Sequence, residues 1–126
     1  AAACQLGAHL LERGRGADAL QWLYRAIELQ PDMLNAYLHI DASLQALGRL
    51  ADAEILWRRA IQAMPQRAEG YDHLGNILQR QGRMAEAETC YRRAAQFRVG
   101  AEADYVLGLQ LSELGRLEEA EVLLKR

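Results

Sequence analysis

The chain has 126 residues and a net charge of −2; 51% of its residues are hydrophobic and 25% are charged. This balance is ordinary for a folded globular protein, and it lacks the basic excess with which proteins bind the phosphates of nucleic acids. No run approaches the roughly 18 apolar residues that a membrane-spanning helix needs. We therefore expect neither nucleic acid binding nor membrane insertion.

The start of the chain and its cysteines give some information about the setting. The chain begins at Ala1 instead of a methionine, so we expect it to be a fragment of a longer protein. Its cysteines, Cys4 and Cys90, are too few for a disulfide framework and are typical of a reducing compartment. On these grounds we expect a cytoplasmic location. The chain holds 14 arginines and one lysine, a ratio that suggests a GC-rich bacterial genome.

A Gly-Arg pair recurs along the chain with a nearly fixed period. The pairs Gly14-Arg15, Gly48-Arg49, Gly82-Arg83 and Gly115-Arg116 are separated by 34, 34 and 33 residues, and after each pair an Asp or Glu precedes an Ala. A period between about 20 and 50 residues marks a chain of stacked repeats, in which each unit packs on its neighbours. Such chains form long exposed surfaces, so the period favours a binding function over catalysis.

Helical periodicity recurs within each repeat. In the second repeat the apolar stripe of Tyr37, Ile40 and Leu44 predicts one helix. Gly48 marks its end, because glycine adopts the left-handed conformation of a helix terminus at least cost. A second apolar stripe predicts another helix, which stops before Pro65. The whole pattern predicts no strand, and it predicts helices over residues 2–14, 17–30, 34–47, 51–63, 68–81, 85–97, 101–114 and 118–126.

Large and small residues occupy matching positions in each repeat. Counted from Leu34, the second repeat has Tyr37 at position 4, Ala53 at position 20, Trp57 at position 24 and Pro65 at position 32. With the matching residues of the other repeats, this pattern resembles the tetratricopeptide repeat (TPR) family across essentially the whole chain. The resemblance implies an all-α, right-handed superhelical solenoid of antiparallel helix pairs that forms a single domain. The chain would hold about 3.7 repeats, over residues 1–33, 34–67, 68–100 and 101–126, the last incomplete.

Three features depart from the family pattern. Asp41 occupies position 8, where the family prefers a small residue. A buried carboxylate there must be solvated, hydrogen-bonded or protonated, and we favour a carboxylate at a water-accessible edge over one that contacts a ligand. The link between the third and fourth repeats is one residue short, with Val99-Gly100 in place of the proline region, so we expect that junction to tilt the last repeat and to be more mobile. Asp104 replaces the usual aromatic residue at position 4, beside Tyr105.

The TPR resemblance implies that the first helix of each repeat lines a concave groove. Carried onto this chain, the predicted peptide contacts are Asn35, Leu38, His39, Asp72, His73, Asn76, Arg80 and Leu109. Acidic residues outnumber basic ones in this groove, which favours a basic or neutral protein or peptide ligand. Some TPR domains clamp acidic C-terminal tails with lysines, an arginine and asparagines, and we reject that function. The matching positions here hold Cys4, Ala8, His39, Glu69 and His73.

No motif for catalysis, a cofactor or a metal ion accompanies this pattern. His39 and His73 share one position in successive repeats, about 10 Å apart when helices stack, which is too far to share a zinc ion. The paired arginines follow acidic residues by four positions, as on a solvated helix face. Trp22 and Trp57 lie at positions that we expect to be buried. We therefore expect a non-catalytic protein-binding scaffold without cofactors.

Two alternatives to this scaffold stay open. The chain would also suit the targeting or substrate-recognition domain of a larger enzyme, such as a protein glycosyltransferase whose TPR helices carry asparagines at the position of Asn76. A third hypothesis is self-assembly, because solenoids normally need polar capping repeats and none is visible at the C-terminal end. The residues predicted to form that self-association face are Leu117, Val122, Leu123 and Leu124.

Overall fold

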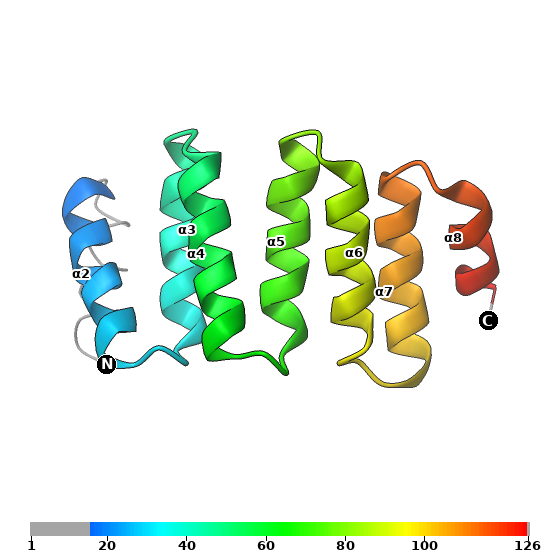
Figure 1. Cartoon of the computed structure of the whole chain (residues 1–126), viewed down its shortest axis with the longest axis horizontal. Helices are drawn as coiled ribbons and strands as arrows, with labels where there is room; N and C mark the ends of the chain where they lie inside the picture. Colours follow the sequence, from blue (N-terminus) through cyan, green and yellow to red (C-terminus); the bar gives the residue numbers. More distant parts are fainter. Residues whose placement is uncertain (1–15, 126) are drawn as a thin grey trace. The chain divides into compact units, whose positions relative to one another are not determined.

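The computed structural model describes residues 16–125, and this part of the chain forms seven helices and no strand. The helices are α2 (Gly16–Leu29), α3 (Leu34–Ala46), α4 (Leu50–Ala63), α5 (Ala68–Arg80), α6 (Met84–Ala95), α7 (Gly100–Glu113) and α8 (Leu117–Leu124) (Figure 1). Each begins and ends within two residues of its predicted position, so the all-α prediction is confirmed. The helix predicted over residues 2–14 lies outside the described residues.

The tight turn within each helix pair is built by the repeated Gly-Arg pair. At Gly82 the backbone φ is 80°, a left-handed value that glycine adopts without steric penalty. The N–H of Gly82 donates to the carbonyl of Gln79 (3.0 Å), and the N–H of Arg83 donates to the carbonyl of Leu78 (2.9 Å). These two bonds form a Schellman motif, which satisfies carbonyls that the helix end leaves unpaired. The same two bonds recur one repeat earlier and one repeat later.

The arginine of each pair also stabilises the start of the second helix. Arg49 immediately precedes α4 and pairs with Asp52 at 2.7 Å, and Arg83 precedes α6 and pairs with Glu86 at 2.5 Å. An acidic side chain in the first turn is favoured by the partial positive charge of a helix N-terminus. Because these side chains are largely exposed, each ion pair contributes about 1 kcal/mol or less. The recurring sequence Gly-Arg-x-x-acid is therefore a local signal for a turn followed by a helix.

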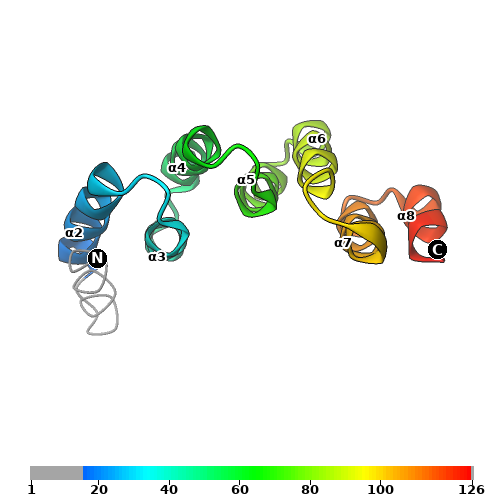
Figure 2. The ribbon, with the colours of Figure 1, turned by 90° about the horizontal axis from the view of Figure 1, so that it is seen from below.

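The helices group into two compact units, Ala1–Met64 and Pro65–Arg126. In the first unit α3 packs against both α2 and α4. In the second unit α6 packs against α5 and α7, and α7 packs against α8. Figure 2 shows that α6 is displaced to one side of α5 and α7, and that α3 is displaced from α4 within its own unit. The single domain over residues 1–126 stays a prediction.

A small residue on the first helix of a pair makes room for a large residue on the second. A Cβ atom at Gly75 would lie 2.5 Å from Cε1 of Tyr91, whose ring is fully buried, so this position has no space for a side chain. In the fourth repeat a Cβ atom at Gly108 would lie 2.8 Å from Leu124. The spacing of small and large residues that resembles the TPR pattern is thus a steric requirement of the helix pair.

A second recurring contact joins α3 and α5 to the prolines that precede them. The hydroxyl of Tyr37 donates to the carbonyl of Pro31 (2.6 Å), and the hydroxyl of Tyr71 donates to the carbonyl of Pro65 (3.1 Å). Both tyrosines are at position 4 of their repeats. In the fourth repeat Asp104 occupies this position, so the shortened junction is held by different contacts, described below.

Candidate functional site

The second unit places three of the predicted contacts on one face of α5. His73, Asn76 and Arg80 follow one another at spacings of three and four residues, which aligns their side chains along the helix. Asn76 and Arg80 are exposed and His73 is half-buried. On α7, Leu109 is 42% exposed. We call these four residues the α5–α7 surface.

The first unit carries three further predicted contacts on α3. Asn35 is exposed, whereas Leu38 and His39 are half-buried. These residues form a set of their own, separate from the α5–α7 surface. Their role in ligand binding stays a prediction.

Asp72, also a predicted contact, is occupied by partners within the second unit. Arg98, in the link before α7, forms an ion pair with this carboxylate through two bonds, one of which measures 3.2 Å. Nε2 of Gln110 on α7 donates to the same carboxylate at 2.7 Å. The hydrogen bond from Arg98 to Asp72 raises the pKa of the guanidinium despite its partial burial. These bonds tie α5 to α7 through Asp72, and its contact with a ligand stays a prediction.

The shortened link between the third and fourth repeats is held by this ion pair and by an aromatic stack. Gly100 has a φ of 63°, so the chain enters α7 through a left-handed residue. The rings of Tyr71 and Phe97 stack with centroids 5.6 Å apart, and the guanidinium of Arg93 lies 5.6 Å from the Phe97 centroid. These contacts stabilise the junction. They argue against the greater mobility that we expect for this junction from the sequence. That mobility stays a prediction.

Tyr91 of α6 reaches the α5–α7 surface from the core. Its ring is fully buried, while its hydroxyl lies 2.8 Å from Oδ1 of Asn76 and 2.8 Å from Oε1 of Gln79. Burial, followed by the negative charges of Glu113 and Asp72, raises the pKa of Tyr91 above its ordinary value. The phenol therefore keeps its proton at neutral pH. The sequence predicts Asn76 as a peptide contact, and the structure adds that a tyrosine from the neighbouring helix joins Asn76 to Gln79.

In the second repeat Asp41 occupies the position of Gly75, and its polar atoms are used internally. Its carboxylate is only 7% exposed, and it accepts hydrogen bonds from Nε1 of Trp57 (2.8 Å) and from Nε2 of Gln45 (2.7 Å). The prediction of a carboxylate at a water-accessible edge is therefore wrong, and the hydrogen-bonded alternative is confirmed. Trp57 is fully buried, as predicted. The ring of Tyr37 packs beside it, with centroids 6.2 Å apart.

Comparison with known families agrees with this architecture. Two family models, both described as tetratricopeptide repeat, match residues 68–98 and residues 101–126, the third and fourth repeats. The chain belongs to the tetratricopeptide repeat family. The glycine turn at Gly48 and the contact between Asp41 and Trp57 show that the second repeat is built on the same TPR positions.

Solved TPR structures share this fold at low sequence identity. One structure of MamA is 22% identical with a TM-score of 0.74, and the alignment covers 98% of this chain and 72% of MamA. A second structure of MamA gives 22% identity, a TM-score of 0.72, and coverages of 98% and 68%. PilF of Pseudomonas aeruginosa is 24% identical with a TM-score of 0.73, and the alignment covers 98% of this chain and 57% of PilF. No curated protein matches the sequence.

Charged residues on the second helices of the TPR pairs neutralise one another. Glu88 and Arg92 on α6 form an ion pair at 2.9 Å with the predicted four-residue spacing, as does the equivalent pair one repeat earlier. Glu88 also pairs with Arg116 at 2.6 Å, and Glu119 pairs with both arginines. Hydrogen bonds from Arg92 and Arg116 lower the pKa of Glu119. Among the described residues, the arginines of this network are paired with glutamates and so do not form the basic stripe that phosphate backbones require.

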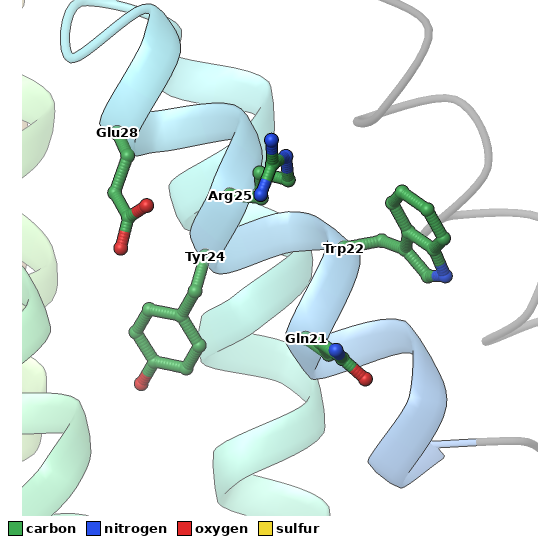
Figure 3. Close-up of a pocket in the computed structure, with 5 residues that line it drawn as sticks. All are labelled: Gln21, Trp22, Tyr24, Arg25 and Glu28. Atoms are coloured by element: carbon green, nitrogen blue, oxygen red, sulfur yellow. The ribbon is translucent and has the colours of Figure 1, made fainter.

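The TPR helix α2 carries a hollow lined by Gln21, Trp22, Tyr24, Arg25 and Glu28. Figure 3 shows Trp22 extending from one side of α2, and Tyr24 and Glu28 extending from the other, so these side chains do not converge. Ligand sites need polar groups that point to a common place, and this hollow has no such arrangement. Trp22 is 39% exposed, so the prediction that it is buried is wrong.

The residues predicted to mediate self-association lie on α8 of the last TPR repeat. Leu117 and Val122 are 64% and 61% exposed, and Leu123 is half-buried. Leu124 is 42% exposed even though it packs against Gly108. Self-association through these residues stays a prediction.

The sequence of this TPR chain predicts neither a metal site nor a membrane span. Among residues 16–125, no three His, Cys, Asp or Glu side chains are grouped so that they would hold a metal ion. None of the helices within that range combines the length and the apolar character needed to cross a bilayer.

Proposed function

We propose that this chain is a non-catalytic protein-interaction module that binds an extended segment of a partner protein along the α5–α7 surface. The observation that carries the proposal is the row of His73, Asn76 and Arg80 on α5. The row offers hydrogen-bond donors and acceptors at a regular spacing, and Leu109 on α7 adds an exposed apolar side chain. A partner segment in extended conformation also presents backbone hydrogen-bond donors and acceptors at a regular spacing, with its side chains between them.

Apolar anchorage in this proposal comes from α7. Leu109 is 42% exposed and Tyr105 is 59% exposed. Large apolar and aromatic side chains supply most of the free energy in protein interfaces, whereas the polar groups around them mainly fix orientation. The partner segment should therefore carry at least one apolar side chain next to its polar positions.

The charge of the surface favours an uncharged or weakly basic segment. The acidic excess expected from the sequence is reduced, because Asp72 pairs with Arg98 and Glu69 lies 3.7 Å from Arg67. Glu102 is exposed and gives the surface a weak negative character. Strongly acidic tails should therefore bind worst.

A peptide array tests the proposal. The purified chain is applied to an array of extended peptides that vary in charge and apolar content, together with the variant His73→Ala/Asn76→Ala/Arg80→Ala. We expect neutral and weakly basic peptides with one apolar anchor to bind, and the triple variant to lose them. Circular dichroism of the variant should match that of the parent chain, because the three substitutions introduce alanine at helical positions where it has the highest propensity.

A matched control carries three alanines at exposed positions, which are Thr89 on α6, Gln96 directly after α6, and Glu121 on α8. This control should retain every array signal. Selective signals that survive the His73/Asn76/Arg80 variant would contradict the assignment of the surface. A complete lack of selective signals would contradict peptide binding itself.

We also propose that the protein acts in the cytoplasm and without a cofactor. The low cysteine content and the protein-interaction fold support this setting. Fractionation of cells that produce the full-length protein tests the location, and recovery of the chain in the membrane or secreted fraction would contradict it.

A further inference from the structure

The hydroxyl of Tyr91 contacts two side-chain amides but carries a single proton. It lies 2.8 Å from Oδ1 of Asn76 and 2.8 Å from Oε1 of Gln79, and both distances are those of strong hydrogen bonds. A phenol donates one hydrogen bond and accepts others, whereas an amide group offers a carbonyl oxygen on one side and two N–H donors on the other. The hydroxyl can donate to only one of the two oxygens at a time. The other amide must then turn its NH₂ group toward the phenol oxygen.

This constraint couples the outward-facing atoms of the two amides. When Tyr91 donates to Asn76, the NH₂ group of Asn76 faces outward and the carbonyl of Gln79 faces outward. When Tyr91 donates to Gln79, both assignments reverse. Because Asn76 and Gln79 are three residues apart on α5, they are neighbours on the helix face. In either arrangement the surface presents one donor group and one acceptor side by side.

We propose that Tyr91 is a positioning residue that makes Asn76 and Gln79 a complementary donor–acceptor pair for the backbone of an extended peptide. One residue of an extended segment directs its N–H and C=O to the same side, as in a hydrogen-bonded pair of a β-sheet. The acceptor of the pair binds that N–H, and the donor binds that C=O. The inference deepens the proposed function and rests on it.

The buried position of Tyr91 separates positioning from contact. Its side chain is fully buried, so a peptide on the surface cannot touch it. The raised pKa of its phenol keeps the proton in place across the neutral range. Neither Asn76 nor Gln79 has another side-chain hydrogen bond among residues 16–125, so their outer atoms are available to a ligand.

The other described repeats lack this arrangement. In the second repeat the equivalent indole of Trp57 donates to Asp41, and Ala42 occupies the position of Asn76. In the fourth repeat Leu124 and Leu109 occupy the positions of Tyr91 and Asn76. Backbone recognition by this device therefore belongs to the third repeat.

The first test uses the protein without ligand. The side-chain amide signals of Asn76 and Gln79 are assigned in a ¹H–¹⁵N spectrum with the help of Asn76→Ala and Gln79→Ala. In Tyr91→Phe, which keeps the buried ring and removes the hydroxyl, both signals should move toward the shifts of freely solvated amides. Tyr71→Phe, which removes a hydroxyl bonded to the carbonyl of Pro65, should leave them unchanged. Unchanged signals in Tyr91→Phe would overturn the positioning role.

The second test uses a blocked decapeptide of alternating threonine and serine with one leucine at its centre, which is uncharged, favours extended backbone and carries an apolar anchor. Its titration should move the Asn76 and Gln79 amide signals of the parent chain. Its affinity should fall about fivefold in Tyr91→Phe and should not change in Tyr71→Phe. In the Asn76→Ala background, Tyr91→Phe should have a smaller effect, because the two residues act through one another.

The outcomes separate this inference from the proposed function. Equal affinity of the decapeptide for the parent and for Tyr91→Phe would overturn the positioning role. Equal binding of a decapeptide methylated at its backbone nitrogens would overturn backbone recognition. If the decapeptide does not bind the parent chain while the array yields selective peptides, the inference fails and the proposed function stands.

Discussion

The indole of Trp57 donates a hydrogen bond to the carboxylate of Asp41 across the helix pair of the second repeat, at 2.8 Å and away from solvent. Asp41 takes a position that glycine fills in the third and fourth repeats, because its partner at position 24 is a tryptophan whose N–H donates to the carboxylate. A buried carboxylate is tolerated only with such partners. The residues at positions 8 and 24 thus act as matched pairs, and exchanging one member should be costly.

Replacing Trp57 with phenylalanine should destabilise the chain by about 3 kcal/mol, since it removes a donor to a buried charged group and leaves a small void. Asp41→Asn keeps an acceptor for the indole and removes the charge, so it should change stability by about 1 kcal/mol or less. Urea unfolding followed by circular dichroism measures both. The double variant Asp41→Ala/Trp57→Phe should lose less stability than the sum of the losses in Asp41→Ala and in Trp57→Phe. A double variant as unstable as the sum of its single changes would contradict the pairing.

Replacing Gly75 with alanine should destabilise the third repeat by about 1–3 kcal/mol, because the new Cβ would lie 2.5 Å from the ring of Tyr91 and the pair would have to separate. The sign is informative, since alanine otherwise favours a helix over glycine by about 1 kcal/mol. In a Tyr91→Ala background the same substitution should cost much less, because the ring that the new Cβ would meet is absent. Thermal unfolding of the four chains measures the difference, and a Gly75→Ala chain more stable than the parent would show that the contact is not tight.

The local architecture could be predicted from the sequence because its signals lie within a few residues of one another. The turn at Gly82 requires a left-handed residue, and the helix after it begins with an arginine and an acid at fixed spacing. Likewise, the ring of Tyr91 requires Gly75, and both residues occupy their family positions. Such requirements repeat every 33 or 34 residues, so each repeat reinforces the interpretation of the others.

The partners of polar side chains could not be predicted, because they lie on different helices. Asp41 and Trp57 are 16 residues apart, and Asp72 and Gln110 are 38 residues apart. Which of these atoms meet depends on the rotation and spacing of packed helices, which hydrophobic periodicity defines only coarsely. For this reason the sequence predicts Asp72 as a ligand contact but does not reveal the hydrogen bond that it accepts from Gln110.

Replacing Arg98 with alanine should loosen the junction between the third and fourth repeats. The carboxylate of Asp72, which is 17% exposed, would keep only its bond from Gln110, and we expect a loss of about 1–3 kcal/mol. Hydrogen exchange should show the change mainly as faster exchange in α7 and α8. Arg67→Ala is the matched control, because Arg67 and Glu69 are exposed and 3.7 Å apart, so its effect should stay below about 1 kcal/mol. Equal exchange in the two variants would contradict a special role for Arg98.

The network on α6 and α8 should make stability depend on pH in the acid range. Hydrogen bonds from Arg92 and Arg116 lower the folded-state pKa of Glu119 below its ordinary value of 4.5. The native state then binds fewer protons than the unfolded state, so the contribution is fully present above 4.5 and is lost as the pH falls through the lowered pKa. Glu119→Gln should flatten this acid limb of the thermal midpoint against pH, and salt should weaken the effect in the parent chain. Glu118→Gln is the control, because residues 16–125 offer Glu118 no ion pair within 4.0 Å, and it should keep the acid limb of the parent. An acid limb that is unchanged in Glu119→Gln would show that the network contributes nothing measurable to folding.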